Sequence, residues 1–370
     1  MLTKKFHLSY LCTSLGWGGL EMNHLRNAIW MQERGHHVTL ICTEGSPLHQ
    51  SALKTTLSVI SIQKPAKHYA FLSAFRLYQQ LKHIQTEHVL IRSTFDLSLA
   101  ASISVFSNRK IKTHFFMEMM FQGKKNQFFR TIRYRKLSSW VCSLEYMKNA
   151  VCSSTRMDPQ KIHVISSALD FSQLCTNSRE EARRQLNLPQ NVRIYGMVGR
   201  IDRKKRLDLA IFAFAKLTDT KSQLIFIGEE TPDNKDHITQ ELKVLIHANQ
   251  LQDRVHFLGF NENPYLHYCA MDALIMASDF ETFGMSTIEA MAHQTPVIAS
   301  NSAGSKELLE KFPFGKLFQP GDAKSLTHAM ASLDEIQEMT LDKVAFRNTF
   351  DHQQFCQIIE SHILSLESAR

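Results

Sequence analysis

Short apolar runs alternate with amphipathic helical patterns along most of this chain. The first apolar run, at residues 6–11, leads through a glycine-containing loop into a helical pattern that ends at Gly35. The next run, at residues 38–42, predicts a second strand. Within the helical pattern, apolar residues recur at spacings of three and four, namely Met22, Leu25 and Ile29. This rhythm predicts parallel sheets flanked by helices.

Two series of predicted strands are separated by a polar stretch at residues 177–190. The first series continues at residues 88–92, 111–116 and 162–166. The second series comprises residues 193–198, 223–227, 255–258, 273–276 and 296–299. Near the end of the chain, a helical pattern places apolar side chains on one face, at Phe355, Ile358, Ile359, Ile363 and Leu366.

The length of the chain fits two domains. At roughly 150 residues per domain, 370 residues suffice for two domains and a terminal appendage. We therefore predict an α/β protein with an amino-terminal domain at residues 1–172, a linker at 173–190, a carboxyl-terminal domain at 191–340 and a helical segment at 341–370.

Composition and charge narrow the classes of protein that fit this pattern. With 44% hydrophobic and 21% charged residues, the chain has enough apolar material for folded cores. The excess of 43 Lys and Arg over 35 Asp and Glu favours anionic partners. No apolar run approaches the roughly 18 residues of a spanning helix. The seven cysteines include no Cys-x-x-Cys pair, which argues against a disulfide framework and a structural zinc site. We expect a cytoplasmic protein.

The most informative segment is residues 279–292, where a loop containing Glu281 runs into a helix containing Glu289. A helix amino terminus presents free N–H groups and the positive end of a dipole, so the turn at residues 283–286 suits an anionic or hydroxyl-rich ligand. The two carboxylates could accept hydrogen bonds from sugar hydroxyls. The alternative is a capping box, in which Glu289 only satisfies the amide of Ser286.

Two further loops carry candidate chemistry. Cations crowd residues 199–206, directly after a predicted strand, and a loop at the carboxyl end of a parallel strand faces the ligand crevice. Arg and Lys side chains there can neutralise a diphosphate without a metal. The alternative is a solvated basic turn. The glycine loop at residues 14–19 lets backbone approach a ligand, although its spacing is not the dinucleotide fingerprint.

Together these segments resemble the family-4 glycosyltransferases (glycosyl transferases group 1), which are retaining enzymes with the GT-B fold. Their Glu-x7-Glu motif corresponds to Glu281 and Glu289. The other matching motifs are Gly18-Gly19-Leu20-Glu21, Gly199-Arg200 with Lys205, Ile227-Gly228-Glu229, Val255-His256-Phe257-Leu258-Gly259, and Gly304 with Glu307. The match covers nearly the whole carboxyl half and is looser in the amino half.

The resemblance implies two Rossmann-like domains whose parallel sheets face a central cleft, with the terminal helix packing back toward the amino-terminal domain. It implies that Arg200 and Lys205 bind the donor diphosphate, Glu281 the donor sugar and Glu289 the ribose. Arg200, Lys205, Glu281 and His114 form the implied catalytic set. The implied donor-binding set comprises Gly18, Gly19, Gly199, Arg200, Lys205, Gly228, Phe260, Glu281, Phe283, Gly284, Met285, Ser286 and Glu289.

The sequence also departs from the family pattern. The usual Pro-Asn-Gly of the interdomain hinge is replaced by Ser166-Ser167-Ala168, and Arg206 stands where a glycine often follows the donor lysine. His114 is the nearest candidate for the histidine that many relatives carry near the reacting sugar. A different register would place Met117 there, and a structural role for His114 is the alternative.

The stretch at residues 115–136 places apolar residues beside basic ones. On a loop it could dip into an anionic membrane surface or receive a lipid-linked acceptor. The alternative is a buried strand end followed by a solvated basic helix. The residues concerned are Phe115, Phe116, Met117, Met119, Met120 and Phe121, followed by Lys124, Lys125, Arg130, Arg133, Arg135 and Lys136.

The expected function is therefore transfer of a hexose, with retention, from a nucleotide-sugar donor to a glycan or lipid-linked acceptor, in cell-envelope polysaccharide or lipopolysaccharide synthesis. No metal or other cofactor is expected, and the protein is expected in the cytoplasm, with the inner face of the membrane as a peripheral location. The alternative is a pseudo-enzyme that keeps the donor site without transfer. No nucleic-acid partner is expected, because no RNA- or DNA-binding signature is present.

Overall fold

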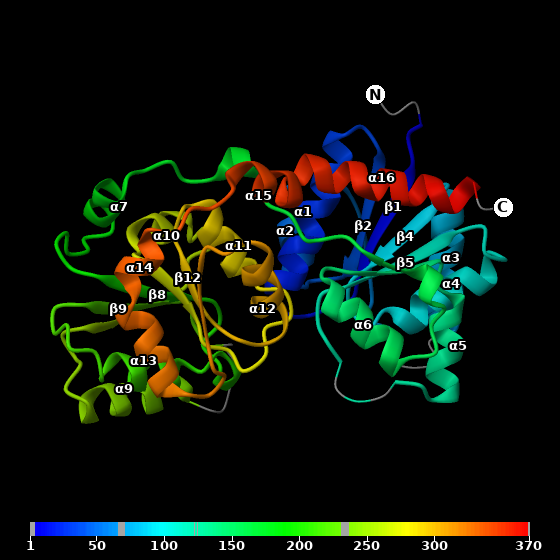
Figure 1. The fold of residues 1–370 in the computed structure, drawn as a ribbon. Helices are drawn as coiled ribbons and strands as arrows, with labels where there is room; N and C mark the ends of the chain where they lie inside the picture. Colours follow the sequence, from blue (N-terminus) through cyan, green and yellow to red (C-terminus); the bar gives the residue numbers. More distant parts are fainter. Residues whose placement is uncertain (1–3, 66–70, 122, 124, 231–236, 369–370) are drawn as a thin grey trace. The chain divides into compact units, whose positions relative to one another are not determined.

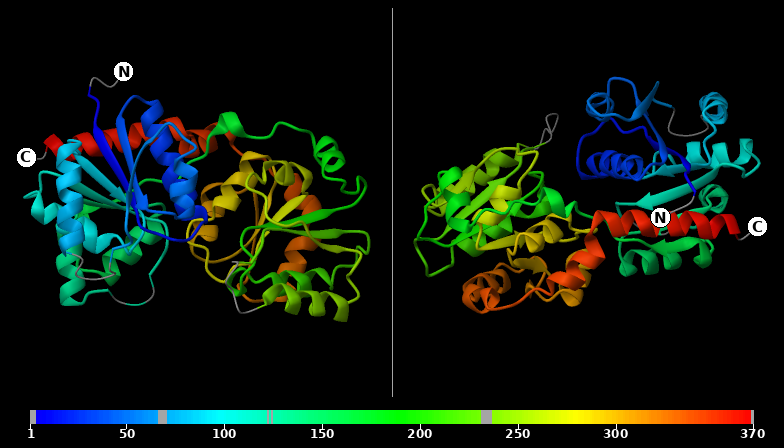
Figure 2. Two further views of the ribbon diagram at one scale, coloured as in Figure 1. Left: turned by 180° about the vertical axis from the view of Figure 1, so that it is seen from behind. Right: turned by 90° about the horizontal axis from the view of Figure 1, so that it is seen from above.

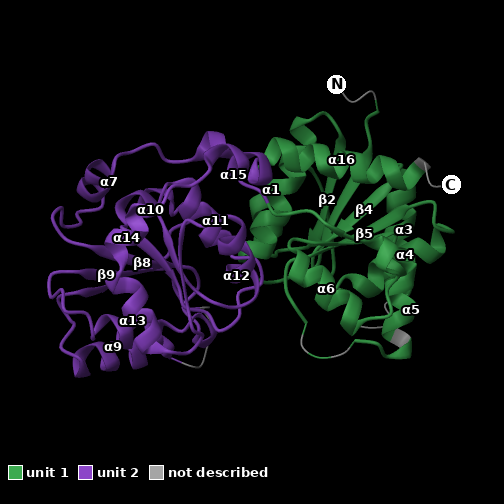
Figure 3. Ribbon diagram, viewed as in Figure 1, with its two compact units in different colours: residues 1–167, 352–370 green, residues 168–351 purple. Residues whose placement is uncertain are grey.

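The computed structural model describes residues 4–65, 71–121, 123, 125–230 and 237–368. The chain divides into two compact units, one formed by residues 1–167 with 352–370 and the other by residues 168–351 (Figure 3). Each unit contains one sheet of parallel strands with helices on both faces (Figure 1 and Figure 2). The α/β class that the alternating pattern predicts is confirmed, and so are the two Rossmann-like units that the resemblance implies.

The first unit has a seven-stranded sheet in the order β3-β2-β1-β4-β5-β6-β7. Its strands are β1 His7–Cys12, β2 His37–Thr43, β3 Ser58–Ile62, β4 His88–Ile91, β5 Lys112–Met117, β6 Ser139–Cys142 and β7 Ile162–Val164. Its helices are α1 Gly19–Glu33, α2 Pro47–Ala52, α3 Phe71–His83, α4 Leu97–Phe106, α5 Phe128–Lys136, α6 Glu145–Ser154 and α16 His352–Ser368. The strand order reverses between β1 and β4, and in an open parallel sheet such a switch point forms a ligand crevice at the carboxyl ends of the strands.

The second unit has a six-stranded sheet in the order β10-β9-β8-β11-β12-β13. Its strands are β8 Ile194–Val198, β9 Gln223–Ile227, β10 Val255–Phe257, β11 Ala273–Met276, β12 Val297–Ser300 and β13 Gly315–Phe318. Its helices are α7 Arg179–Gln185, α8 Leu207–Phe214, α9 Ile238–Ala248, α10 Tyr265–Ala270, α11 Met285–Ala292, α12 Ala303–Lys311, α13 Ala323–Ala331, α14 Leu333–Gln337 and α15 Lys343–Phe350. Here the switch point lies between β8 and β11.

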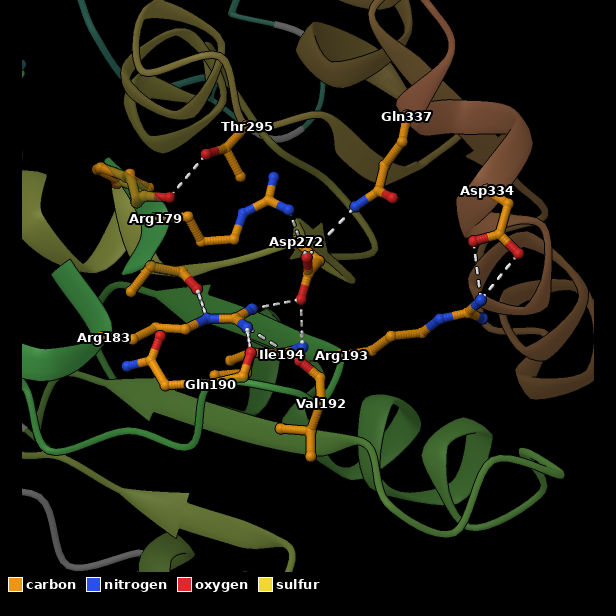
Figure 4. A network of polar contacts seen from close by, with 12 residues as sticks. Arg179, Arg183, Gln190, Val192, Arg193, Ile194, Asp272, Thr295, Asp334 and Gln337 are labelled. Carbon is orange, nitrogen blue, oxygen red and sulfur yellow. Dashed lines mark hydrogen bonds and ion pairs between the residues drawn. The ribbon is translucent and has the colours of Figure 1, made fainter. Parts of the chain in front are cut away.

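The segment at 173–190, expected to link the domains, is instead a packed part of the second unit. It contains α7, which begins with a capping box between Ser178 and Glu181. Arg183 is buried and donates hydrogen bonds to three backbone carbonyls while its guanidinium pairs with Asp272 at 2.6 Å (Figure 4). Asp272 also accepts a hydrogen bond from the amide of Ile194 in β8. The charged sequence of α7 suggested a solvated linker, whereas the helix is attached to the sheet through this ion pair.

The last predicted segment, 341–370, is divided between the two units. Helix α15 lies in the second unit and α16 in the first, where Phe355, Ile359 and Ile363 are buried as expected, while Ile358 is 45% exposed. The Glu360 carboxylate of α16 accepts a hydrogen bond from the Arg34 guanidinium at 2.7 Å. The terminal helix therefore packs on the amino-terminal unit, as the fold prediction required.

Candidate functional site

The switch point of the second sheet is built from backbone that only glycine permits. Gly199 after β8 and Gly228 after β9 have φ angles of +137° and +143°. A Cβ on Gly228 would lie 1.9 Å from the carbonyl oxygen of Gly199. The two strand ends are therefore packed backbone to backbone, and Gly228 acts through this packing.

A short 3-10 turn, Arg203–Lys205, follows Gly199, and the cations in and after this turn have different partners. The Asp202 carboxylate caps the turn by accepting hydrogen bonds from the amides of Lys204 and Lys205. Arg206 then takes the left-handed conformation, with φ of +52°, which explains why relatives often carry glycine at this position. Its guanidinium pairs with Asp208 and Asp279, and that of Arg203 pairs with Glu241.

Two of these cations reach the candidate acidic loop, Arg206 through Asp279 and Lys205 through Glu281. The Lys205 ammonium lies 2.7 Å from a carboxylate oxygen of Glu281, in the loop after β11. The Ser278 hydroxyl donates a hydrogen bond to the same oxygen at 3.2 Å. Lys205 and Glu281 are partly exposed, whereas Arg200 is exposed and has no ion-pair partner within the described residues. This arrangement presents a lysine and an arginine to an anion and a carboxylate to hydroxyl groups.

Helix α11 begins beside this pair. Its amino-terminal cap is Gly284, with φ of +90° and no side-chain cap. The Thr287 amide already donates to the Gly284 carbonyl, whereas the amides of Met285 and Ser286, as the first of the helix, have no acceptor within it and are suited to an anionic oxygen. Phe283 is buried and its ring packs against Phe350, so only its backbone is available to a ligand.

Glu289 does not close a capping box. Ser286 lies inside α11 rather than at its cap, and its hydroxyl donates a hydrogen bond to the Val198 carbonyl at 3.3 Å. The Glu289 carboxylate accepts a hydrogen bond from the Tyr268 hydroxyl at 2.8 Å. Burial, together with the charge of Glu289, raises the pKa of Tyr268 well above its usual value, so Tyr268 remains a donor. The structure thus fixes the position of Glu289 without using it for the helix.

Phe260, from the implied donor-binding set, and Gly304, a supporting motif match, contact the loops after β9 and β11. Phe260 follows β10, is exposed, and its amide donates a hydrogen bond to the Glu229 carboxylate. Gly304, a supporting match, donates its amide to the Glu281 carbonyl at 2.9 Å, and a Cβ there would lie 2.5 Å from the carbonyl of Thr282. Gly304 therefore supports the loop that carries Glu281.

In the first unit, Gly18 caps α1 and Gly19 is its first residue. A Cβ on Gly19 would have no protein atom within 4 Å, which leaves room for a ligand. These glycines lie in the loop after β1, at the switch point of this sheet.

His114 requires a correction, because the structure gives it a packing role. It is fully buried in β5, where one ring nitrogen lies 3.0 Å from His88 and the other 2.8 Å from the Ser139 hydroxyl. Burial lowers its pKa well below the usual value for histidine. Met117, at the alternative position, is buried in the same strand. Neither side chain is available to a reacting sugar.

The stretch at 115–136 is also corrected in part. Phe115, Phe116 and Met117 are buried in β5 and cannot reach a membrane. Of the remaining candidates, Lys124 lies outside the described residues, and α5 is the part that presents both apolar and basic side chains to solvent.

Sequence reasoning missed three supporting residues: Asp202, Tyr268 and Ser278. Asp202 carried a usable signal, because an aspartate two residues before a turn amide is a common cap. Tyr268 and Ser278 carried none. The described residues contain no cluster of three or more His, Cys, Asp or Glu side chains placed to hold a metal ion. Within the same described ranges, no helix combines the length and apolar character needed to cross a bilayer.

Comparison with known proteins finds glycosyltransferases among the proteins that this chain resembles. Residues 178–343 match the family model of the glycosyl transferases group 1. A Campylobacter jejuni N-acetylgalactosamine-N,N'-diacetylbacillosaminyl-diphospho-undecaprenol 4-alpha-N-acetylgalactosaminyltransferase is 26% identical over 235 residues, which are 63% of this chain and 60% of the relative. A D-inositol 3-phosphate glycosyltransferase of Mycolicibacterium gilvum is 31% identical over 44% of this chain and 37% of its own length. This chain therefore spans less than two thirds of either relative.

Solved structures extend the similarity to the whole fold. Anabaena HepE, crystallised with UDP and glucose, superposes with a TM-score of 0.84 at 19% identity, over 97% of this chain and all of HepE. The lipopolysaccharide outer core galactosyltransferase WaaB superposes with a TM-score of 0.72 at 16% identity, over 97% of this chain and 99% of WaaB. The chain has the GT-B fold, and the expected resemblance to GT-B glycosyltransferases is confirmed.

Proposed function

We propose that this GT-B protein of the glycosyl transferases group 1 type transfers a hexose from a nucleoside-diphosphate sugar to a glycan or lipid-linked acceptor, with retention of configuration. The observation that carries the proposal is the Lys205–Glu281 pair, 2.7 Å apart at the sheet switch point and directly before the free amides of α11. It combines an anion-binding and a hydroxyl-binding group within the reach of one nucleotide sugar.

The donor would bind with its diphosphate on Arg200 and Lys205. Its sugar hydroxyls would donate to Glu281, and its ribose hydroxyls to Glu289, which Tyr268 holds in place. As the bond between the anomeric carbon and the diphosphate oxygen breaks, negative charge grows on the leaving diphosphate. Fixed cations stabilise that charge more in the transition state than in the ground state, so they accelerate the reaction.

Retention requires the acceptor oxygen to reach the anomeric carbon from the face that the diphosphate leaves. On that face the departing phosphate oxygen is the nearest base, and we assign to it the proton of the acceptor hydroxyl. The burial of His114 favours this assignment, because its ring nitrogens are already engaged. No metal is given a role.

The names of the relatives support a place in cell-envelope synthesis. The Campylobacter jejuni relative is named for a sugar acceptor on diphospho-undecaprenol, and WaaB is named for the lipopolysaccharide outer core. We extend this setting to the present chain, acting at the cytoplasmic face of the membrane.

A panel of nucleotide sugars tests the proposal. The parent protein should be stabilised against heat by one nucleoside diphosphate and should hydrolyse the matching nucleotide sugar slowly in the absence of acceptor. Lys205→Ala should lose both effects, while Lys204→Ala, an exposed neighbour in the same turn, should keep them. Stabilisation without hydrolysis or transfer would favour the pseudo-enzyme. If no nucleotide binds, the proposed function is wrong.

A further inference from the structure

A groove in the first unit is not used by the donor site. Its volume is about 800 Å³, within the range of small-molecule sites. It lies at the switch point of the sheet, because one wall is the loop after β1, at residues 13–16, and another is α4, which follows β4. Helix α5, the first residue of α3, Phe71, and Lys64 with Pro65 after β3 also line the groove.

The lining of the groove is mainly apolar and faces solvent. Leu15, Phe71, Phe95 and Val105 are each more than half exposed. Phe75, which is also exposed, extends this apolar surface because its ring packs against Phe106 of the lining. A contiguous exposed apolar surface of this kind marks a binding site on a soluble domain.

Helix α5 contributes three cations to this groove, and Lys64 contributes a fourth from the segment after β3. Arg130, Arg133 and Lys136 follow one another at spacings of three along α5, so they share a face of the helix. Arg133 donates a hydrogen bond to the Ser98 hydroxyl of α4 at 2.6 Å, which fixes its guanidinium at the rim. Arg130 and Lys136 have no acidic partner, and no carboxylate lines the groove, among the residues that the structure describes.

We propose that this groove binds the lipid portion of a lipid-linked acceptor, with a single apolar chain between α3, α4 and α5 and its phosphate on Arg130 and Arg133. This inference rests on the proposed function and specifies its acceptor class. An apolar lining with a cluster of basic side chains on α5 complements a molecule that joins a hydrocarbon chain to an anionic head. A free glycan would need a lining rich in hydrogen-bonding groups.

The position of the groove gives the acceptor a direction. Residues 13–16 line the groove and end two residues before Gly18 and Gly19, which are the expected approach to the donor diphosphate. A phosphate held at α5 would therefore leave the attached sugar near this loop. A concave groove suits one chain, whereas docking to a bilayer uses a flat or convex apolar face.

Binding of farnesyl phosphate below its aggregation concentration tests the inference without any donor. By calorimetry, the parent protein should bind farnesyl phosphate at least tenfold more tightly than farnesol or inorganic phosphate. Val105→Glu should reduce this affinity at least tenfold, because it places a carboxylate in the apolar groove. Val244→Glu, an equally exposed valine on α9 of the other unit, should leave it unchanged.

A second pair of variants tests the phosphate subsite. Arg130→Gln with Arg133→Gln should bring farnesyl phosphate to the affinity of farnesol. Lys110→Gln with Arg135→Gln removes the same charge from exposed positions that do not line the groove and should have no effect. Equal loss in both double variants would overturn the subsite.

The outcomes separate this inference from the proposed function. If the parent is stabilised by a nucleoside diphosphate but does not bind farnesyl phosphate, the groove assignment is overturned and the donor assignment stands. If it sediments with phosphatidylglycerol vesicles but does not bind monomeric farnesyl phosphate, the surface docks to membranes and the groove assignment is again overturned. If it binds farnesyl phosphate but no nucleotide, the groove assignment stands and the proposed function fails.

Discussion

Lys205 and Glu281 form an ion pair at 2.7 Å although 76 positions separate them in the chain. The pair joins the loop after β8 to the loop after β11, and these two strands are neighbours only because the sheet reverses its order there. The fold therefore creates the pairing of opposite charges that the proposed donor chemistry requires.

Substitution of Lys205 should separate catalysis from folding. We expect Lys205→Ala to lower the rate of donor hydrolysis by on the order of 10²-fold or more, as for other groups that stabilise charge in a transition state. The Tm should change little, because the ion pair is partly exposed. Steady-state kinetics and thermal melting of this variant and of Lys204→Ala provide the measurement. Equal rates for the two variants would contradict the assigned role.

Substitution of Glu289 should weaken nucleotide binding. Glu289→Gln removes a charged acceptor, and hydrogen bonds to charged groups contribute about 1.5–3 kcal/mol, so we expect a loss of roughly tenfold or more in affinity for the nucleoside diphosphate. Stability should be nearly unchanged, since Gly284 rather than Glu289 caps α11. Calorimetric titration would measure the affinity, with Glu310→Gln on α12 as the control. An unchanged affinity together with a lowered Tm would show that Glu289 has a structural role and does not bind the nucleotide.

Replacement of His114 should affect stability and not chemistry. His114→Gln disturbs buried hydrogen bonds to His88 and Ser139, and an unsatisfied buried group costs about 1–3 kcal/mol. Below the melting transition, we expect turnover per folded molecule to equal that of the parent. A fall of 10²-fold in turnover with an unchanged Tm would restore a catalytic role to this histidine.

The first unit should lose stability in acid through its buried histidines. Burial lowers the pKa of His88 and of His362 to about 4, against 6.5 for an unperturbed histidine. The folded state thus keeps both rings neutral while the unfolded chain takes up protons below about pH 6.5. The free energy of unfolding is therefore unaffected by these two histidines above pH 6.5, and they lower it as the pH falls toward 4.

Urea unfolding at several pH values checks this expectation. The free energy of unfolding should fall between pH 7 and pH 4.5 in the parent and fall less in His362→Gln. His83→Gln, at an exposed position on α3, should retain the slope of the parent. If the free energy of unfolding of His362→Gln falls with pH as steeply as that of the parent, this histidine does not cause the loss of stability in acid.

The anchor of α16 should be sensitive to Glu360. This carboxylate is 1% exposed and faces both Arg34 and His36, and loss of one partner from a buried ion pair costs about 3–5 kcal/mol. We expect Glu360→Gln to fall near the lower limit, because Arg34 is 21% exposed. Lys4→Gln breaks the exposed pair with Glu367 on the same helix and should cost less than about 1 kcal/mol. Equal denaturation midpoints for the two variants would contradict the anchor.

The apolar runs predicted the buried strands well because parallel strands are covered on both faces. Three strands were missed for identifiable reasons. β3 and β13 are edge strands whose residues are mostly partly exposed, and β6 offers only three consecutive apolar residues, Trp140 to Cys142, between serines. The Gly199, Lys205 and Glu281 cluster was predictable because each residue lies within a local motif.

Other parts of the structure depend on contacts between distant residues that no local pattern encodes. The segment expected to be a polar linker is a packed helix because Arg183 forms an ion pair with Asp272. His114, a candidate catalytic residue, is a core residue because other side chains surround it and engage its ring nitrogens. The groove in the first unit was equally hidden. Its apolar residues come from separate elements, and only the folded sheet brings them to one place.

The discontinuity of the first unit bears on how the chain is synthesised. Its first 167 residues leave the ribosome without α16, and the side chains of Trp30 and Arg34 that this helix covers stay uncovered while residues 168–351 are translated. At ribosomal speeds of about 5–20 residues per second, this interval lasts roughly ten seconds or more. The second unit is continuous in sequence and is translated before α16, so a released chain that ends at residue 351 should contain a protease-resistant carboxyl-terminal unit and an amino-terminal unit that is still sensitive.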